Sequence, residues 1–140
     1  MRKHFLFCFG LFCLLFLAIG CGKNCSLKGK VVFSDDQTPL TLGTICLVSD
    51  KGIARGDIDK DGNYVVGSVS AKDGLPPGNY RIYLTDTEIF EPVAGPVAGL
   101  PRRVPQIEDK YSQPDTSGLT LEVKSSMTHN IEVDRYGGSR

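Results

Sequence analysis

The sequence predicts an all-β protein, and three observations carry the prediction. Short runs of residues alternate between apolar and polar side chains, which is the pattern of half-buried strands. Turn-forming residues separate these runs, and the chain contains 16 glycines and 8 prolines. Beyond the first twenty residues, no stretch has the length and spacing of a substantial helix. About seven short strands divided in this way indicate a β-sandwich.

The first twenty residues have the composition of a secretory signal peptide. Arg2 and Lys3 give a positive start, an apolar run covers residues 5–19, and Gly20 precedes Cys21. A positive start, about 7–15 apolar residues and a small residue before the cleavage point are typical of such signals. A transmembrane helix needs about 20 apolar residues, so this run is too short to be one. We therefore expect residues 1–20 to be removed.

The end of this segment, Leu17-Ala18-Ile19-Gly20-Cys21, resembles the lipobox of bacterial lipoproteins. The resemblance implies that the thiol of Cys21 receives a lipid, that the signal is cleaved, and that the new amino group is acylated. Several acyl chains anchor a protein firmly, because each buried methylene contributes about 0.8 kcal/mol. An ordinary signal peptide cleaved near Gly20 is the alternative.

A lipidated Cys21 would make residues 21–26 a short tether and the membrane a partner of the protein. By the sorting rule of some enteric lipoproteins, Gly22 in place of aspartate permits transfer to the outer membrane. We therefore expect a lipid-anchored protein of the cell envelope, on the outer membrane and facing the periplasm or the exterior.

The remaining chain is expected to form one domain over residues 27–134. In the first strand, Lys28 and Lys30 face away from the apolar positions, and in the fifth Tyr80, Ile82 and Leu84 share one face. Asp-Gly at positions 61 and 62 suits the positive φ of a hairpin turn. The predicted strands span residues 27–33, 44–49, 53–58, 64–66, 79–85, 119–124 and 131–134.

Two further segments are predicted to lack regular structure. The pattern is lost over residues 86–118, a long Pro-rich loop, and loops of this length are usually functional or disordered. Residues 135–140 form a polar, glycine-bearing tail, which we expect to be flexible.

The motifs of the predicted strands and turns resemble the carboxypeptidase-regulatory-like domain. They comprise Gly29 to Phe33, Pro39-Leu40, Gly43-Thr44, Ala54 to Gly56, Asp61 to Tyr64 and Pro77 to Ile82. The run from Lys110 to Val123 is similar to the C-terminal part of small lipoproteins of planctomycete-type bacteria. The resemblance implies a seven-strand, transthyretin-like (prealbumin-like) sandwich that acts as a non-catalytic accessory module.

Candidate catalytic and metal-binding patterns are weak. Asp57, Asp59 and Asp61 alternate like the first half of a calcium loop, but Ser68 occupies the position where that loop needs a bidentate glutamate. His129 is the single histidine beyond the signal peptide, and no nucleophile turn of the Gly-x-Ser-x-Gly type occurs. We therefore predict that the protein is not an enzyme and binds no metal and no cofactor. An enzyme that resembles hydroxyisourate hydrolase, which has a transthyretin-like fold, is an unfavoured alternative.

Charge and cysteine content narrow the function further. Without residues 1–20, the chain has 14 basic and 16 acidic residues, which gives no indication of a nucleic-acid surface.

Cys25 and Cys46 remain and could pair outside the cytoplasm. If the first two strands formed a simple hairpin, these cysteines would lie roughly 20 Å apart, beyond disulfide reach. A sandwich that separates the two strands would remove this objection.

The function predicted from these features is that of a membrane-anchored structural or binding module. Its partner would be an envelope protein or a glycan, and the alternative is a carbohydrate- or peptide-binding accessory domain. Tyr83 and Tyr111 are the candidate binding residues. The Pro-rich loop from Glu91 to Pro114 is, with Tyr111, the candidate contact surface, because rigid scaffolds often present function on loops. The loop could instead cover a sheet edge.

Overall fold

A computed structural model describes residues 23–68, 73–93 and 99–137 of the chain. These residues contain ten β-strands and one 3-10 helix, and no α-helix. The elements are β1 Leu27–Phe33, β2 Thr44–Ser49, β3 Gly52–Asp57, β4 Asn63–Val66, β5 Gly78–Thr85, β6 Glu88–Glu91, β7 Arg102–Pro105, η1 Asp109–Ser112, β8 Leu119–Val123, β9 Met127–Thr128 and β10 Ile131–Val133.

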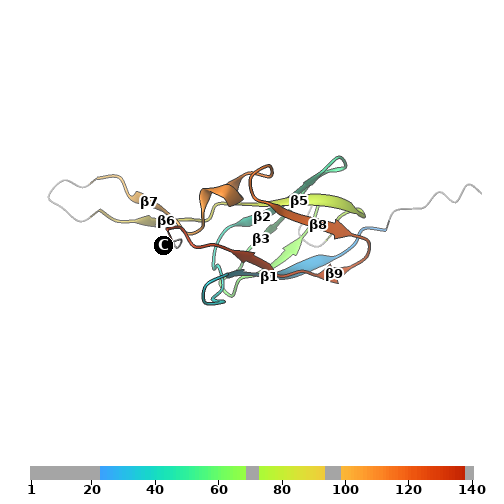
Figure 1. Cartoon of the computed structure of the whole chain (residues 1–140), viewed down its shortest axis with the longest axis horizontal. Helices are drawn as coiled ribbons and strands as arrows, with labels where there is room; N and C mark the ends of the chain where they lie inside the picture. Colours follow the sequence, from blue (N-terminus) through green and yellow to red (C-terminus); the bar gives the residue numbers. More distant parts are fainter. Residues whose placement is uncertain (1–22, 69–72, 94–98, 138–140) are drawn as a thin grey trace, which may run out of the picture.

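The strands form two four-stranded sheets and a separate two-stranded ribbon. In the first sheet β1 lies in the centre, with β4 on one side and β9 and β10 on the other. The second sheet has the order β3-β2-β5-β8, and all its pairings are antiparallel. Strands β6 and β7 form the ribbon. The two four-stranded sheets pack face to face as a sandwich, and the ribbon extends beyond one end of it (Figure 1).

All seven predicted strand segments are strands in the structure, and most of them alternate between the core and the solvent, whereas β2 buries three successive residues. In β5, Tyr80, Ile82 and Leu84 are buried, whereas Arg81 is exposed. In β1, Leu27 and Phe33 are buried and Lys28 is exposed. The prediction of an all-β sandwich is therefore confirmed in its coarse form.

The number and pairing of strands differ from the prediction. The described residues contain three more strands, and two of these, β6 and β7, lie in the segment 86–118 that was predicted to be a loop. Strands β1 and β2 do not form a hairpin. Instead, β1 pairs in parallel with β10, and β2 pairs with β3 and β5.

One apolar core lies between the two sheets. The side chains buried most completely come from both sheets and from the loops that close the sandwich: Tyr64, Leu27, Leu40, Ile45, Leu47, Leu75, Ile82, Leu84, Val31, Val66, Val123 and Val133. Because a buried hydroxyl needs a partner, the hydroxyl of Tyr64 donates to the carbonyl of His129 at 2.5 Å, and that of Tyr80 donates to the carbonyl of Pro76.

Two glycines permit close backbone approaches in this core. A Cβ on Gly29 would lie 1.8 Å from the carbonyl oxygen of His129, next to the hydroxyl of Tyr64. A Cβ on Gly56 would lie 2.3 Å from the carbonyl oxygen of Val65, where β3 of one sheet approaches β4 of the other. Neither glycine has positive φ, so steric room explains both.

Candidate functional site

Cys21, the predicted lipidation site, lies outside the described residues, as does the whole predicted signal peptide. The described chain begins at Lys23, and the fold begins two residues later. The backbone of Cys25 exchanges hydrogen bonds with that of Leu75 at 2.8 and 3.0 Å, and the Cys25 side chain is buried. Ser26 also receives a hydrogen bond from Met127. The predicted tether of residues 21–26 is therefore too long at its C-terminal end, since Cys25 and Ser26 belong to the domain.

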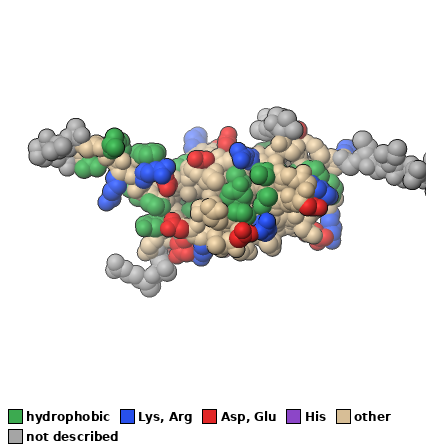
Figure 2. All heavy atoms as spheres, turned by 90° about the horizontal axis from the view of Figure 1, so that it is seen from above, with side chains coloured by type: hydrophobic (Ala, Val, Ile, Leu, Met, Phe, Trp, Pro, Cys, Tyr) green, Lys and Arg blue, Asp and Glu red, His purple; other side chains and the backbone are tan. Residues whose placement is uncertain are grey.

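The β6-β7 hairpin is the most exposed apolar feature of the described residues. Of their six exposed large hydrophobic side chains, four belong to it: Ile89, Phe90, Val93 and Leu100. Hydrophobic side chains lie along the projecting hairpin in Figure 2. Neither β6 nor β7 packs extensively against a strand of the sandwich. An isolated two-stranded hairpin is only marginally stable in water, so these side chains are well placed to gain from a partner.

Charges on the hairpin are paired within it. Arg102 lies 3.2 Å from a carboxylate oxygen of Glu91, and Arg103 lies 2.9 Å from one of Glu88. The Arg103 guanidinium also lies 5.8 Å from the centre of the Phe90 ring. Because the two acids and two bases balance, the hairpin offers apolar contact without a net charge.

The chain leaves the sandwich for this hairpin at the end opposite to its first described residues. Strand β1 begins at one end of the long axis of the molecule, and the hairpin extends from the other end (Figure 1). A protein attached through the residues before Lys23 would therefore carry the hairpin at the part of the fold most remote from the attachment.

Tyr83, a predicted binding residue, lies half-buried on the outer face of the second sheet. It pairs in register with Cys46 of β2 and shares its face with Arg81, two residues earlier on β5. Burial raises the pKa of the Tyr83 hydroxyl, so this group stays protonated at neutral pH. Tyr83 is thus close to the surface and only partly available to a ligand.

A shallow hollow of about 500 Å³ lies on the same outer face, over the ends of β5 and β8. Its lining includes the polar or charged side chains of Asp50, Asn79, Arg81, Thr120 and Glu122. Ligand pockets commonly have volumes of about 300–1,000 Å³, so the hollow has the size for a small polar ligand. Tyr83 is not part of the lining.

Tyr111, the other predicted binding residue, is a core residue. Its side chain is 6% exposed, and its hydroxyl lies 2.9 Å from a carboxylate oxygen of Asp134. Lys110, its neighbour in η1, bonds the same carboxylate at 2.5 Å and that of Glu108 at 2.9 Å. The expectation that Tyr111 presents a contact surface is therefore wrong, because η1 packs it against the end of β10.

The Asp134 carboxylate connects three segments of the chain. Hydrogen bonds from Lys110, Ser34 and Tyr111 hold its pKa at about 2, with the Lys110 bond contributing most. The same contacts with Asp134 and Glu108 raise the pKa of Lys110 above its usual range. Both groups are thus charged at neutral pH, and the arrangement stabilises the fold without offering a free acid or base.

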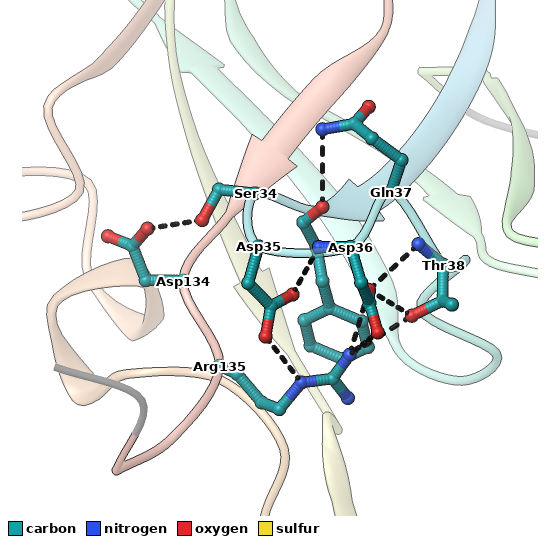
Figure 3. Close-up of polar contacts among 8 residues, drawn as sticks. Ser34, Asp35, Asp36, Gln37, Thr38, Asp134 and Arg135 are labelled. Atoms are coloured by element: carbon teal, nitrogen blue, oxygen red, sulfur yellow. Dashed lines mark hydrogen bonds and ion pairs between the residues drawn. The ribbon is translucent and has the colours of Figure 1, made fainter. Parts of the chain in front are cut away.

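Arg135 fastens the C-terminal segment to the turn after β1 (Figure 3). Its guanidinium bonds the carboxylates of Asp35 at 3.2 Å and Asp36 at 3.1 Å, and it lies 3.7 Å from the centre of the Phe33 ring. The next residue, Tyr136, donates a backbone hydrogen bond to Gln106. The predicted flexible tail of residues 135–140 is therefore structured at its start, and residues 138–140 lie outside the described chain.

The turn that resembled half a calcium loop is closed by its own hydrogen bonds. Asp59 accepts bonds from the backbone and the side chain of Asn63 and from the backbone of Asp61, and these contacts lower its pKa. Across residues 23–68, 73–93 and 99–137, no group of three potential ligands is arranged to hold a metal ion.

The remaining cysteines and the histidine have structural surroundings. Cys25 and Cys46 are both buried and both free. Burial raises the pKa of the Cys46 thiol. His129 is half-buried, and burial lowers its pKa. Its backbone accepts the Tyr64 hydroxyl and donates to Lys28.

A second hollow, of about 410 Å³, lies on the outer face of the first sheet. Lys28 and Lys30 line it, together with Asn63, Thr128 and Asn130. The sequence placed both lysines on the polar face of the first strand without assigning them a role. Alternation along β1 could have found the pair, but the uncharged neighbours come from β4 and from the chain around β9, which only the fold brings together.

These features define the chain as an all-β sandwich domain with a projecting hairpin. No family model matches the sequence, and no curated protein matches it. A solved DUF3823 family protein from Bacteroides ovatus ATCC 8483 is similar in structure, with a TM-score of 0.46 and 18% identity over 81% of this chain and 45% of its own. BcpA*(D312A), the major pilin subunit of Bacillus cereus, has a TM-score of 0.44 and 13% identity over 81% of this chain and 30% of its own. The chain thus spans less than half the length of either protein.

In the described residues, no helix has the length and apolar character needed to cross a membrane.

Proposed function

We propose that the protein is a cell-envelope lipoprotein whose β-sandwich is held at a membrane by a lipid on Cys21 and serves as a non-catalytic binding module. The proposal includes the topology of the sandwich, which would be the transthyretin-like arrangement of carboxypeptidase-regulatory-like domains. The lipobox-like end of the signal supports the anchor. The start of the fold at Cys25 supports a domain close to the membrane, because only residues 22–24 separate it from Cys21.

The observation that carries the binding role is the apolar β6-β7 hairpin at the end of the molecule opposite to Lys23 (Figure 1). Phe90 is 63% exposed and Leu100 90% exposed. Exposed apolar patches on soluble domains mark interaction sites more often than scattered single residues do. An envelope protein is the partner that suits the hairpin, since its charges are paired internally and its apolar side chains lack a cover.

The anchor is tested by metabolic labelling with a fatty acid. We expect the wild-type chain to take up label and to fractionate with membranes, and the Cys21→Ser variant to lose both properties. Lys23→Ser is the control for an effect of altering the tether, and it should keep the label. Label retained in Cys21→Ser would overturn the proposed anchor.

The contact surface is tested with a photo-crosslinking residue placed at Phe90 in cells. We expect a discrete crosslinked species of one partner, lost when Leu100→Ser is added to the same chain. A crosslinker at Ile53, an exposed apolar residue of β3, is the matched control and should not give that species. The same species from both positions, or none from Phe90, would contradict a role for the hairpin.

A second candidate function is favoured by the hollow over β5 and β8. Its mixture of carboxylates, a guanidinium, an amide and a hydroxyl suits a carbohydrate or a short peptide. Binding to a glycan or peptide array that falls with Arg81→Ala would support it, and Arg55→Ala on β3 is the control. A hydroxyisourate-hydrolase-like activity is disfavoured by the single histidine of residues 23–137, His129, and a direct hydrolysis assay tests it.

A further inference from the structure

The outer face of the first sheet carries two lysines beside the start of the fold. Lys28 and Lys30 alternate with the buried positions of β1, so both point away from the core. Val65 and Thr128 lie opposite Lys28 on the neighbouring strands, and Asn63 lies opposite Lys30. The hollow that the two lysines line contains no carboxylate among its lining residues. We call Lys28 and Lys30, with the exposed Lys23 before them, the lysine face.

Other lysines of the described residues have partners within the protein, and Lys51 donates to the carbonyl oxygen of Pro77. Within the described residues, Lys60 pairs with Asp61, Lys110 with Asp134 and Glu108, and Lys124 with Glu122. Neither Lys28 nor Lys30 forms an ion pair in the same part of the chain.

The carboxylates closest in the fold to this face do not pair with its lysines. Asp59, in the turn before β4, accepts side-chain and backbone bonds from Asn63, the residue opposite Lys30, and Glu132 of β10 accepts a bond from Gln37. The ammonium groups of Lys28 and Lys30 are therefore open to an anionic partner.

Charge is distributed unevenly along β1. Its first half carries Lys28 and Lys30, and the turn after its last residue carries Asp35 and Asp36. The positive end is the end at which the chain enters the domain (Figure 1). Seven residues lead from Cys21 to Lys28, and at about 3.5 Å each they cannot separate these residues by more than about 25 Å.

We propose that the lysine face docks onto the anionic phospholipid headgroups of the membrane that holds the protein. The ammonium groups of Lys28 and Lys30 would donate to headgroup phosphates. The outer face of the first sheet would then lie against the membrane at the N-terminal half of β1. This inference rests on the proposed lipid anchor, which brings the face to the membrane.

The test measures vesicle binding with an attachment that does not depend on Cys21. A chain with a hexahistidine tag in place of residues 1–21 is held by a nickel-chelating lipid, in vesicles of phosphatidylcholine with or without phosphatidylglycerol. A basic side chain near an anionic surface strengthens binding by roughly fivefold, so the two lysines should give about 25-fold tighter binding to vesicles with phosphatidylglycerol. At about 1 M salt, where the Debye length is about 3 Å, this gain should disappear.

Charge reversal identifies the face. We expect K28E/K30E to abolish the gain from phosphatidylglycerol, and K60E/K124E, a matched reversal on paired lysines elsewhere, to preserve it. The docking would be overturned if phosphatidylglycerol did not strengthen the binding of the wild-type protein, or if it strengthened the binding of K28E/K30E equally. A melting temperature equal to that of the untagged chain establishes that each tagged protein is folded.

A second measurement uses the full-length protein, recovered from membranes and reconstituted in the same vesicles. Acylation of individual lysines by an amine-reactive ester, read by mass spectrometry, should slow several-fold at Lys28 and Lys30 when phosphatidylglycerol is present, and Lys60 and Lys124 should be unaffected. Equal rates at all four lysines would contradict the docking. The two proposals can fail separately. If the full-length protein takes up no fatty acid but the tagged form still binds more tightly to vesicles with phosphatidylglycerol, the lipid anchor is refuted and the docking of the lysine face is not.

Discussion

Replacing Gly29 with alanine tests how the first sheet is held together. The added Cβ would lie 1.8 Å from the His129 carbonyl oxygen, 2.6 Å from its carbon and 3.0 Å from the Tyr64 hydroxyl. Ordinary contact begins near 3.5 Å, so the carbonyl oxygen would have to move by about 1.7 Å. It cannot do so freely, because the same residue donates its backbone N–H to Lys28 at 2.8 Å.

The expected cost has two parts. Overpacking of a core costs about 1–3 kcal/mol. Loss of the buried bond from Tyr64 to His129 leaves a polar group unsatisfied, which costs a further 1–3 kcal/mol or so. We expect Gly29→Ala to destabilise the protein by about 2–6 kcal/mol, a large fraction of the 5–15 kcal/mol or so that stabilises a typical domain.

Urea unfolding followed by circular dichroism measures the effect. Gly78→Ala is the matched control, since Gly78 also lies in a strand without positive φ. The atom nearest to an added Cβ there would be Nζ at the flexible end of Lys51, at 3.6 Å. That variant should stay within about 0.5 kcal/mol of wild type. Equal midpoints for the two alanine variants would refute the steric argument.

Three further predictions concern the C-terminal contacts and the thiols. Arg135→Ala should lower the free energy of unfolding by about 1 kcal/mol, since it removes surface ion pairs and a ring contact, and an unchanged urea midpoint would contradict this. The pKa of Asp134 is held at about 2, below its unfolded value of about 3.9, so its contribution is full above pH 4 or so and is lost as pH falls toward 2. Asp134→Asn should therefore show a shallower loss of stability over that interval in acid titrations, and parallel curves would exclude the effect. Cys25 and Cys46 should react slowly with a thiol reagent in the folded protein and rapidly in urea, and an intact disulfide in non-reducing mass spectra would disprove the free thiols.

Alternation of side chains predicted most of the core strands, because each of these has one face in the core and one in water. The strand over residues 44–49 was predicted from its β-branched and apolar composition instead, and β2 buries three successive residues. The same rule could not find β6 and β7, since the core covers neither face of the hairpin and their side chains show no useful alternation. Their pairing joins Ile89 to Val104 across a Pro-rich stretch, which reads as a loop. The sequence predicted a contact surface in this Pro-rich segment, but only the structure shows that it forms a hairpin with exposed apolar side chains.

The sequence could not predict the roles of residues whose partners are distant along the chain. Tyr111 was expected on the surface because it lies in the predicted Pro-rich loop, but Asp134, 23 residues later, receives its hydroxyl and η1 buries its ring. Arg135 was assigned to a flexible tail, although Asp35 and Asp36 bind it from the other end of the chain. Local patterns give no distance between such residues, so only the fold relates them.

The parallel pairing of β1 with the end of the chain sets the order in which the protein can fold. Val31 pairs with Ile131 and Leu27 with Met127, so each contact closes a loop of 100 residues. Contacts of such separation form slowly, because the entropy of closing the loop must be overcome first. A chain that emerges from a secretion channel with its N-terminus first therefore cannot complete its first sheet until residue 133 has crossed. If the chain is exported as proposed, export and folding become sequential steps. A truncation before Met127 leaves β1 with β4 as its one remaining strand partner in the described sheet.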